Sequence, residues 1–237
     1  MKFASALVEG RLLKRYKRFL ADVMLDDGEV VTAHTSNTGA MMGCSEPGSR
    51  VWLSRSENPK RKYPFTWEIV EVLPGVLCGI NTLLSNHLVA EAIATGTVPA
   101  LSGYDEIRRE VPYGRENSRI DLLLESGPSA NLPPCYVEVK NVTLNHQGVA
   151  LFPDAVTVRG SKHLRELISV VEDGARAVIF YCVQRGDCRQ LSPADDIDAV
   201  YGQSLRRAID KGVEVMAYQA EVRPEGIQLA EALPVCL

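Results

Sequence analysis

The chain contains 237 residues, of which 46% are hydrophobic and 24% are charged, and it carries a formal net charge of −4. This composition excludes an intrinsically disordered chain, and the length suffices for one large domain or two smaller ones. The charge also excludes a protein that is basic throughout. Residues 1–82 hold 11 Lys and Arg against 9 Asp and Glu, and residues 83–237 hold 15 against 21, so a polyanionic partner would need local basic patches.

The cysteines and the apolar runs indicate the compartment. None of the six cysteines forms a Cys-x-x-Cys pair or a Cys/His cluster with zinc-ligand spacing. The apolar patch near the N-terminus is short and is interrupted by Glu9, so it does not resemble a signal peptide. No apolar run approaches the ~18 residues that span a bilayer. We therefore expect free thiols and a soluble cytoplasmic protein without membrane contact.

The first 80 residues are typical of short strands separated by turns. Alternation of apolar and polar residues, with Gly- and Pro-containing connections, predicts about five strands and a small barrel or sandwich. The predicted strands are "FLADVML" (19–25), "VVTAHT" (30–35), "RVWLSRS" (50–56), "FTWEIVEV" (65–72) and "VLCGINT" (76–82).

From residue 82 the pattern changes to alternating helices and strands. A helix over 82–96 begins at a possible Thr82 cap and ends at Gly96, and a second helix over 159–174 has apolar residues at helical spacing. The run "ARAVIFYCVQ" follows the second helix and precedes a third predicted helix (196–210). It is apolar enough for a central strand that is buried on both faces. The order αβββαβαβ, which ends at "VEVMAYQA" (213–220), predicts an α/β domain with a mixed sheet over 82–237, after a first domain over 1–81.

Two strands of this second domain carry charged residues between apolar ones. If "SRIDLLLES" and "CYVEVKN" pair antiparallel through the turn-rich "GPSANLPP", burying both apolar sets together requires that paired residue numbers have an odd sum. In that register Asp121 lies on the same face as Glu138 and Lys140, on the side away from the core.

Three charged groups on one face suggest a chemistry. Two close carboxylates repel each other unless a hard cation lies between them, and Mg²⁺ binds through one or two carboxylates together with waters and substrate phosphate. A neighbouring ammonium can orient an attacking water or stabilise developing charge. Asp121, Glu138 and Lys140 therefore suit metal-assisted phosphodiester hydrolysis; the alternative is a solvated strand face with a Glu–Lys pair.

Ordered motifs along nearly the whole chain resemble the SfsA family (sugar fermentation stimulation protein A). They include "RLLKRYKRF", "HTSNTGAM", "PGSRVWL", "KYPFTWEIV", "INTLLSNHL", "SRIDLLLE", "VEVKNVTL", "FPDAVTVRGSKHLREL" and "GARAVIFYCVQR". The resemblance implies an N-terminal OB-fold barrel followed by a PD-(D/E)xK nuclease-like domain of the restriction-endonuclease-like class. It also implies non-specific DNA binding and a role in regulating sugar (maltose) utilisation, with cleavage inferred from the fold alone.

The nuclease motif of that family falls on Asp121, Glu138 and Lys140, with Mg²⁺ or Mn²⁺ as the implied cofactor. Ile120 stands where the motif's name has Pro, and Lys17 stands where many relatives have Asn. Nucleases of this fold often place a helical Glu near the metal, which makes Glu91 a candidate third metal ligand. The alternative is an ordinary Glu at the boundary of the helix's apolar face.

Two basic clusters are candidates for contact with nucleic acid. Arg159, Lys162 and His163 lie at the start of the second helix, where cations oppose the helix dipole and a phosphate ligand would be favourable. Asp154, shortly before them, is either a cap or an acid that supports the site. In "RLLKRYKRF" basic residues alternate with aromatic ones, as expected of backbone tracking and base stacking, although basic runs are usually solvated surface. The basic residues of that stretch are Arg11, Lys14, Arg15, Lys17 and Arg18.

The sequence thus leads to a primary hypothesis and two rivals. The first is a DNA-binding protein without strong sequence preference that has a Mg²⁺-dependent phosphodiesterase site. The second is a non-catalytic DNA-binding regulator with a degenerate nuclease fold, and the third takes the barrel as an oligosaccharide binder. His34 and His146 have no Ser/His/Asp partners in sequence, and no phosphate-binding glycine motif occurs. The oligomeric state is not predicted.

Overall fold

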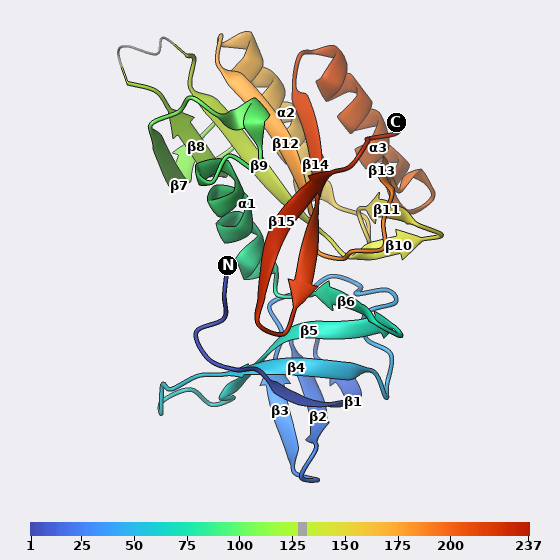
Figure 1. Ribbon diagram of the computed structural model, residues 1–237. Coiled ribbons are helices and arrows are strands. Elements are labelled where there is room, and N and C mark those ends of the chain that lie inside the picture. Colours follow the sequence, from blue (N-terminus) through green and yellow to red (C-terminus); the bar gives the residue numbers. More distant parts are fainter. Residues whose placement is uncertain (128–131) are drawn as a thin grey trace.

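The structure is a computed structural model that describes residues 1–127 and 132–237. The N-terminal part is a closed five-stranded barrel with the topology of an OB fold, at the bottom of Figure 1. Its strands follow the order β3-β2-β1-β4-β5, and parallel pairing of β3 with β5 closes the barrel, whereas β6 extends β5 beyond the closure. The strands are β1 (Val8–Tyr16), β2 (Leu20–Leu25), β3 (Val30–His34), β4 (Arg50–Arg55), β5 (Phe65–Leu73) and β6 (Val76–Gly79).

The rest of the chain forms an α/β domain around a mixed six-stranded sheet with the order β15-β14-β12-β9-β8-β7. Strands β14, β12 and β9 are parallel, and the outer strands β15, β8 and β7 are antiparallel to their neighbours. A three-stranded sheet, β10-β11-β13, accompanies it. The bounds are β7 (Glu106–Tyr113), β8 (Ser118–Glu125), β9 (Cys135–Val142), β10 (Leu144–His146), β11 (Val149–Phe152), β12 (Arg176–Val183), β13 (Gln190–Pro193), β14 (Glu214–Arg223) and β15 (Gly226–Ala232).

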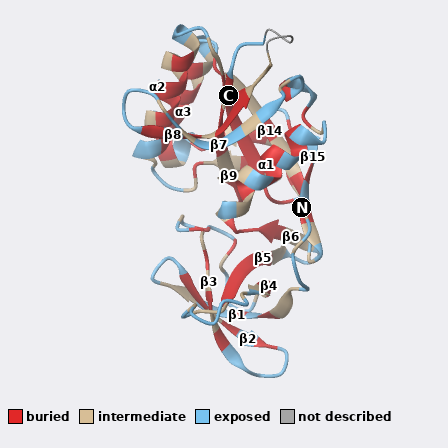
Figure 2. Cartoon of the chain, turned by 90° about the vertical axis from the view of Figure 1, so that its left-hand side faces the viewer, coloured by how far each residue is buried: buried red, intermediate tan, exposed pale blue. Residues whose placement is uncertain are grey.

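Helices cover both faces of this sheet, with α1 on one side and α2 and α3 on the other (Figure 2). The first helical segment is capped by Asn81, whose side chain accepts from Leu83 N, and not by Thr82 as predicted. No helix in residues 1–127 and 132–237 is long and apolar enough to cross a membrane. The helices are η1 (Thr82–Leu84), α1 (Ser85–Ala94), η2 (Pro99–Leu101), α2 (Val158–Glu172) and α3 (Asp195–Asp210).

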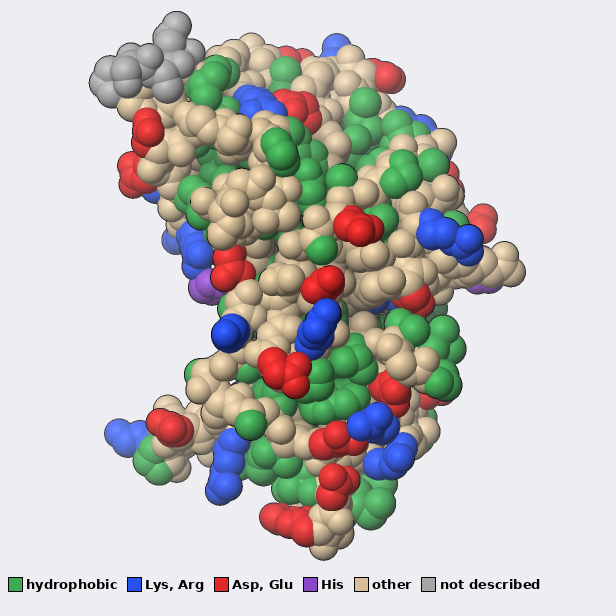
Figure 3. All heavy atoms as spheres, in the orientation of Figure 1, with side chains coloured by type: hydrophobic (Ala, Val, Ile, Leu, Met, Phe, Trp, Pro, Cys, Tyr) green, Lys and Arg blue, Asp and Glu red, His purple; other side chains and the backbone are tan. Residues whose placement is uncertain are grey.

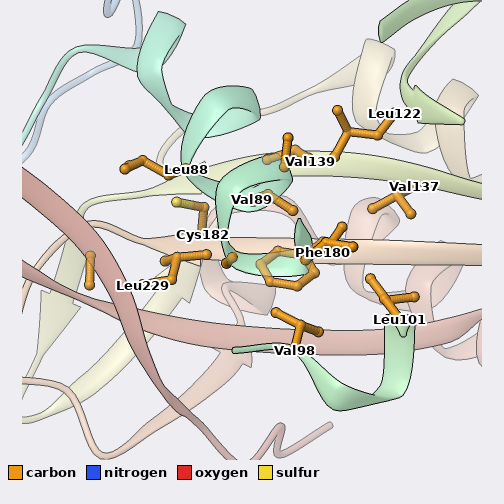
Figure 4. Close-up of a cluster of buried hydrophobic side chains, with 14 of the residues drawn as sticks. Leu88, Val89, Val98, Leu101, Leu122, Val137, Val139, Phe180, Cys182 and Leu229 are labelled. Carbon is orange, nitrogen blue, oxygen red and sulfur yellow. The ribbon is translucent and has the colours of Figure 1, made fainter. Parts of the chain in front are cut away.

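Strand β12 separates the two cores of the α/β domain and supplies residues to both. Phe180 and Cys182 pack against α1, in the cluster drawn in Figure 4, whereas Ile179 and Tyr181 pack against α2 and α3. Every residue of β12 after Arg176 is buried. The prediction of a central strand buried on both faces is therefore confirmed, and the two adjoining cores fix the position of β9 beside it.

The predicted pairing of β8 with β9 is also confirmed. The two strands are antiparallel, with Leu122 opposite Val137 and Leu124 opposite Cys135, so the paired numbers have the expected odd sum. Within the connecting segment "GPSANLPP", residues 128–131 lie outside the described residues. The register follows from burial, because a slip by one residue would turn one apolar set away from the α1 core.

Several strands were not predicted. The basic stretch at 11–16 forms β1, which pairs with both β2 and β4 inside the barrel. The three short strands of the small sheet were also missed, and β14 is not the last strand, since β15 pairs with it antiparallel. The barrel does have five strands, but β1 belongs to them and β6 does not. The six cysteines are free thiols, as predicted.

The turn between β1 and β2 has an unusual backbone. Lys17 and Arg18 have positive φ angles of 50° and 64°, the left-handed region that Asn adopts more readily than Lys or Arg. The twist of such a turn matches that of two antiparallel strands. The turn therefore holds two exposed cations at the tip of a tight hairpin.

Candidate active site

Asp121 lies where β8 and β9 stop pairing. Regular pairing between the two strands covers Leu122 to Leu124, and one residue earlier the side chain of Asp121 takes over from the backbone. Its Oδ2 accepts from Val139 N at 2.7 Å, and its Oδ1 accepts from Asn86 Nδ2 of α1 at 2.8 Å. Burial and the nearby negative charge of Glu138 raise the pKa of Asp121 from 3.8 to about 6. The ionised form of Asp121 is therefore destabilised by burial and by the neighbouring carboxylate of Glu138.

Glu138, in the middle of β9, is only 2% exposed. Its Oε1 accepts from Lys140 Nζ at 2.6 Å and from His163 Nδ1 of α2. Burial alone would raise the pKa of Glu138, but the Lys140 ammonium and His163 together hold it below its ordinary value. Its second oxygen, Oε2, is buried and has no hydrogen-bond partner among the described residues. Burying a carboxylate oxygen without a hydrogen-bond donor costs free energy of folding, and a bound cation would compensate that cost.

The prediction that Asp121, Glu138 and Lys140 converge is consistent with this geometry, but their face is not a solvated one. Helix α2 covers the side of β9 that carries Glu138 and Lys140, and the Lys140 side chain is only 12% exposed. The face opposite the α1 core thus belongs to a second core. The charged groups occupy a nearly closed, low-dielectric site, in which their interactions are stronger than at a surface.

Glu91 does not join the other two carboxylates. Its Oε2 lies 2.5 Å from the N-terminal ammonium of Met1, which also donates to Ile227 O of β15, at the opposite edge of the sheet from β8 and β7. The α1 residue that contacts Asp121 is Asn86. The prediction of Glu91 as a third metal ligand is therefore wrong in its geometry, because the helix turns Glu91 toward β15.

The side chains of the three basic residues at the start of α2 all make hydrogen bonds to other residues of the chain. Arg159 Nε donates to His163 Nε2 at 3.2 Å, and Lys162 Nζ donates to the backbone carbonyl of Glu116 in the β7–β8 turn. His163 is 4% exposed, so its ring is not accessible to a phosphate as predicted; its Nδ1 contacts Glu138 Oε1 instead. Arg159 is the exposed member of the three.

The barrel's predicted basic residues divide into two groups. Arg15 is half-buried, and its Nη2 donates to the carbonyls of Arg18, Asn37 and Gly39, so its role is structural. Arg11 donates to Gly48 O, and Lys14 lies 3.4 Å from Asp22.

Two connections of the barrel carry exposed cations: the β1–β2 turn and the β4–β5 connection, which holds Lys60 and Lys62. Lys17 and Arg18 occupy the β1–β2 turn, and neither forms a salt bridge within residues 1–127 or 132–237. On the face shown in Figure 3, Lys and Arg side chains are interspersed with acidic ones over the barrel, so no broad basic field covers it.

Sequence reasoning missed three other features, two of them near the site and one on the barrel. Asn86 had no signal in sequence, since nothing local indicates that it reaches Asp121. Tyr113, at the end of β7, has a buried hydroxyl without a partner in the described chain, and burial and the charge of Glu138 raise its pKa. The exposed Lys60 and Lys62 of the β4–β5 connection did carry a signal in the sequence, the basic run "KRK" at residues 60–62.

Asp154 contributes to the contact between the two domains. Its Oδ2 accepts from Met41 N of the barrel at 3.1 Å, and it approaches Gly39 closely. The cap of α2 is Thr157, whose side chain accepts from Gly160 N. Asp154 is therefore neither of the two predicted alternatives: it anchors the "HTSNTGAM" loop of the barrel to the α/β domain.

The donor set near Glu138 fits a hard divalent cation. Within the described residues there is no group of three or more His, Cys, Asp and Glu side chains that could hold a metal ion. Two carboxylates are present, one of them with a buried oxygen that lacks a donor. Mg²⁺ commonly binds through one or two carboxylates and retains waters, so this set suits Mg²⁺ or Mn²⁺ better than zinc.

We expect Asp121→Asn to be more stable than the wild type at pH 7 in the absence of metal, by about 2 to 3 kcal/mol. A carboxyl whose folded pKa is raised stabilises the fold only below its ordinary pKa of 3.8, and that stability is lost as the pH rises through about 6. Asn retains an acceptor for Val139 N, and its NH2 group can donate to the Asn86 side chain once the Asn86 amide has flipped to present its oxygen. The difference should therefore disappear near pH 4 when urea unfolding is measured with EDTA between pH 4 and pH 8.

The exposed Asp26, in the β2–β3 turn, provides the matched control. Asp26→Asn should change the free energy of unfolding by less than about 0.5 kcal/mol at every pH. An Asp121→Asn variant that is no more stable than the wild type at pH 7 would show that the ionised Asp121 carboxylate does not destabilise the fold.

Comparisons with known proteins agree along the whole chain. A family model described as the SfsA N-terminal OB domain matches residues 13–80, and one described as the sugar fermentation stimulation protein RE domain matches residues 83–226. Sugar fermentation stimulation protein homologs from Pelobacter propionicus and Geobacter metallireducens are 62% and 59% identical, over 98% and 100% of both chains. The solved structure of Pyrococcus furiosus SfsA in complex with Ca²⁺ matches with a TM-score of 0.89 at 27% identity, and the match covers 100% of this chain and 98% of that one.

Proposed function

The chain belongs to the SfsA family of sugar fermentation stimulation proteins, and from this premise we propose that it binds DNA without strong sequence preference and hydrolyses phosphodiesters with a divalent metal. The observation that carries the catalytic part is the unpartnered, buried Oε2 of Glu138 beside a second, half-buried carboxylate, Asp121. The family name supports a role in the regulation of sugar metabolism.

Asp121 and Glu138 would hold the cation, Mg²⁺ or Mn²⁺. A bound cation supplies Lewis-acid polarisation of a phosphoryl oxygen and neutralises negative charge. Binding would also offset the burial and the repulsion by Glu138 that together raise the pKa of Asp121. The complex of the Pyrococcus furiosus relative with Ca²⁺ supports this assignment, because Ca²⁺ also prefers oxygen ligands.

Lys140 is the residue that would act on the attacking water. Its ammonium lies 2.6 Å from Glu138 Oε1 and is largely shielded from solvent, which fixes its position and strengthens its field. From there it can donate a hydrogen bond to a water molecule and stabilise the negative charge that develops on the phosphoryl oxygens. Lys140 would thus orient the attacking water, and the carboxylates of Asp121 and Glu138 would bind the cation.

The DNA-binding part of the proposal is supported by the barrel's connections. OB folds bind oligonucleotides through the loops that join the first and second strands and the fourth and fifth strands. In this chain the β1–β2 turn carries Lys17 and Arg18, and the β4–β5 connection carries Lys60 and Lys62. Phe19, next to the first turn, is 43% exposed and is available for stacking on a base.

A second candidate function is a DNA-binding regulator without catalysis. The ion pair between Lys140 and Glu138 favours it, because this contact already compensates part of the acidic charge without any metal. Such a protein would bind DNA equally well in EDTA and would leave the DNA intact.

The wild-type chain separates these two functions in one experiment. Supercoiled plasmid is incubated with the protein and Mg²⁺, Mn²⁺ or EDTA, while binding to a labelled duplex is followed by gel shift over a range of salt concentrations. Metal-dependent nicking together with salt-dependent binding supports the proposal. Binding without nicking in any metal supports the regulator, and absence of both contradicts the assignment to DNA.

We expect the double variant Lys17→Asn/Arg18→Asn to bind DNA about tenfold more weakly at ~0.15 M salt, with a salt dependence reduced by about two phosphate contacts. Asn removes both charges and suits the left-handed backbone of the turn, so the hairpin should remain folded. The measurement is the slope of log affinity against log salt concentration.

The control is Arg223→Ala, a 71% exposed cation on β14 of the α/β domain. It should leave both the affinity and the slope unchanged. Equal losses in the double variant and in Arg223→Ala would place the DNA contact elsewhere than on the β1–β2 turn.

A further inference from the structure

Helix α2 brings a histidine to the carboxylate that is proposed to bind the metal. His163 is 4% exposed and lies beneath the N-terminal turns of α2, where its Nδ1 contacts Glu138 Oε1. This contact joins residues 25 positions apart, so it is created by the packing of α2 on β9. The phosphodiesterase chemistry assigned to Asp121, Glu138 and Lys140 does not use this imidazole.

The surroundings of His163 determine which ring nitrogen carries the proton. Arg159 Nε–H points at His163 Nε2 at 3.2 Å, and because a guanidinium is always a donor, Nε2 must be the acceptor. The proton therefore lies on Nδ1, which donates it to Glu138 Oε1. Lys140 Nζ lies 3.2 Å from the same Nδ1, and since both are donors they share Oε1 as a common acceptor.

The two donors act on only one oxygen of Glu138. Oε1 receives Lys140 from the same strand and His163 from the helix, whereas Oε2 is buried and receives no donor from the described residues. A carboxylate held through one oxygen by two donors from different elements cannot rotate about its terminal torsion without losing both bonds. The free oxygen is thereby kept in one position.

We propose that His163 is a positioning residue for the metal site: its Nδ1–H fixes the Glu138 carboxylate so that Oε2 is presented to the divalent cation, and Arg159 fixes the tautomer that makes this possible. The inference rests on the proposed function, since it takes Glu138 as a metal ligand. Removing a residue that hydrogen-bonds to a metal ligand typically lowers the metal affinity about ten- to hundredfold.

A purely structural histidine would behave differently. A ring that only filled space under α2 would be replaced adequately by a residue of similar volume, and an amide would be the poorer substitute. A ring that positions Glu138 through a donor would be replaced adequately by Asn, whose amide carries an N–H group near the position of Nδ1, and poorly by Leu. The two substitutions therefore separate the two roles.

The experiment measures binding of Mn²⁺ alone to the full chain, by calorimetry and by the loss of the free Mn²⁺ signal in electron paramagnetic resonance. We expect His163→Leu to bind Mn²⁺ ten- to hundredfold more weakly than the wild type, and His163→Asn to remain within about threefold of it. Lys162→Ala, on the same helix but bound to the Glu116 carbonyl, should bind like the wild type. Circular dichroism and melting temperatures confirm that each variant is folded.

Each other outcome overturns the inference in a recognisable way. Wild-type affinity in His163→Leu would overturn it and leave the proposed function intact. Loss of binding in folded His163→Asn as well as in His163→Leu would show that the donor is not what matters. Absence of Mn²⁺ binding by the wild type would overturn the proposed metal site, and the inference with it.

Discussion

Glu138→Gln is expected to reduce metal-dependent nicking of DNA more than about a hundredfold while leaving DNA binding unchanged, since loss of a metal ligand should cost more than loss of its outer partner. The amide has nearly the shape of the carboxylate and can still accept from Lys140, so the fold should be preserved. What it removes is the negative charge at the buried Oε2, the atom without a partner. Nicking of supercoiled plasmid with Mg²⁺ or Mn²⁺ is the measurement.

The matched control for this prediction is Glu91→Gln. Glu91 is also an acid of the α/β domain, but its partner is the N-terminal ammonium near β15. It should nick DNA like the wild type. Lys140→Ala should be as inactive as Glu138→Gln, and nicking that persists in both variants would point to a contaminating nuclease and contradict the catalytic assignment.

Arg185→Ala is expected to destabilise the protein by about 3 kcal/mol, because it breaks a largely buried ion pair and leaves the half-buried Asp187 charged and unpaired. Arg185 is 5% exposed and holds Asp187 through two hydrogen bonds of 2.6 and 2.8 Å. Its Nη1 also donates to Thr143 O, just after β9, and its backbone bridges Cys78 of β6. The side chain therefore ties the end of β9 to the segment after β12, and the backbone of that segment pairs with β6.

Arg206→Ala provides the comparison, because Arg206 forms the same two-bond contact with Asp195 at the surface. There the side chains are 37% and 45% exposed, and an exposed pair contributes at most about 1 kcal/mol. Guanidinium unfolding of both variants measures the difference. Similar small losses in the two variants would mean that the Arg185 contacts contribute no more to stability than an exposed ion pair does.

The sequence was most informative where burial alone decides geometry. The alternation of apolar residues in β8 and β9 predicted their odd register, and the register brought Asp121 toward Glu138 and Lys140. The uniform apolar run of β12 predicted a strand with two buried faces. In these cases a different arrangement would expose several large side chains, so a local pattern determines a tertiary contact.

Prediction failed where charge conceals the pattern or where the contact is long-range. In β1 the basic residues dominate, and a bulge after Leu12 interrupts the alternation, so the strand was interpreted only as a basic surface. Strand β15 buries little more than Ile227 and Leu229. The contacts of His163 with Glu138 and of Glu91 with the N-terminus depend on how helices pack on the sheet, and no local spacing encodes that.

The way Asp121 is bonded changes what its presence in a sequence means. Its carboxylate replaces a missing backbone acceptor for Val139 N, so the fold needs an acceptor at this position whether or not a metal binds. An Asp or Asn at 121 is therefore a mark of the fold. The two oxygens of Glu138 differ: Oε1 accepts from Lys140 and His163, as a Gln oxygen could also do, whereas Oε2 bonds to none of the described residues. Under the proposed function, a carboxylate rather than an amide at position 138, together with His163, is thus the better criterion for a metal-binding member of the family.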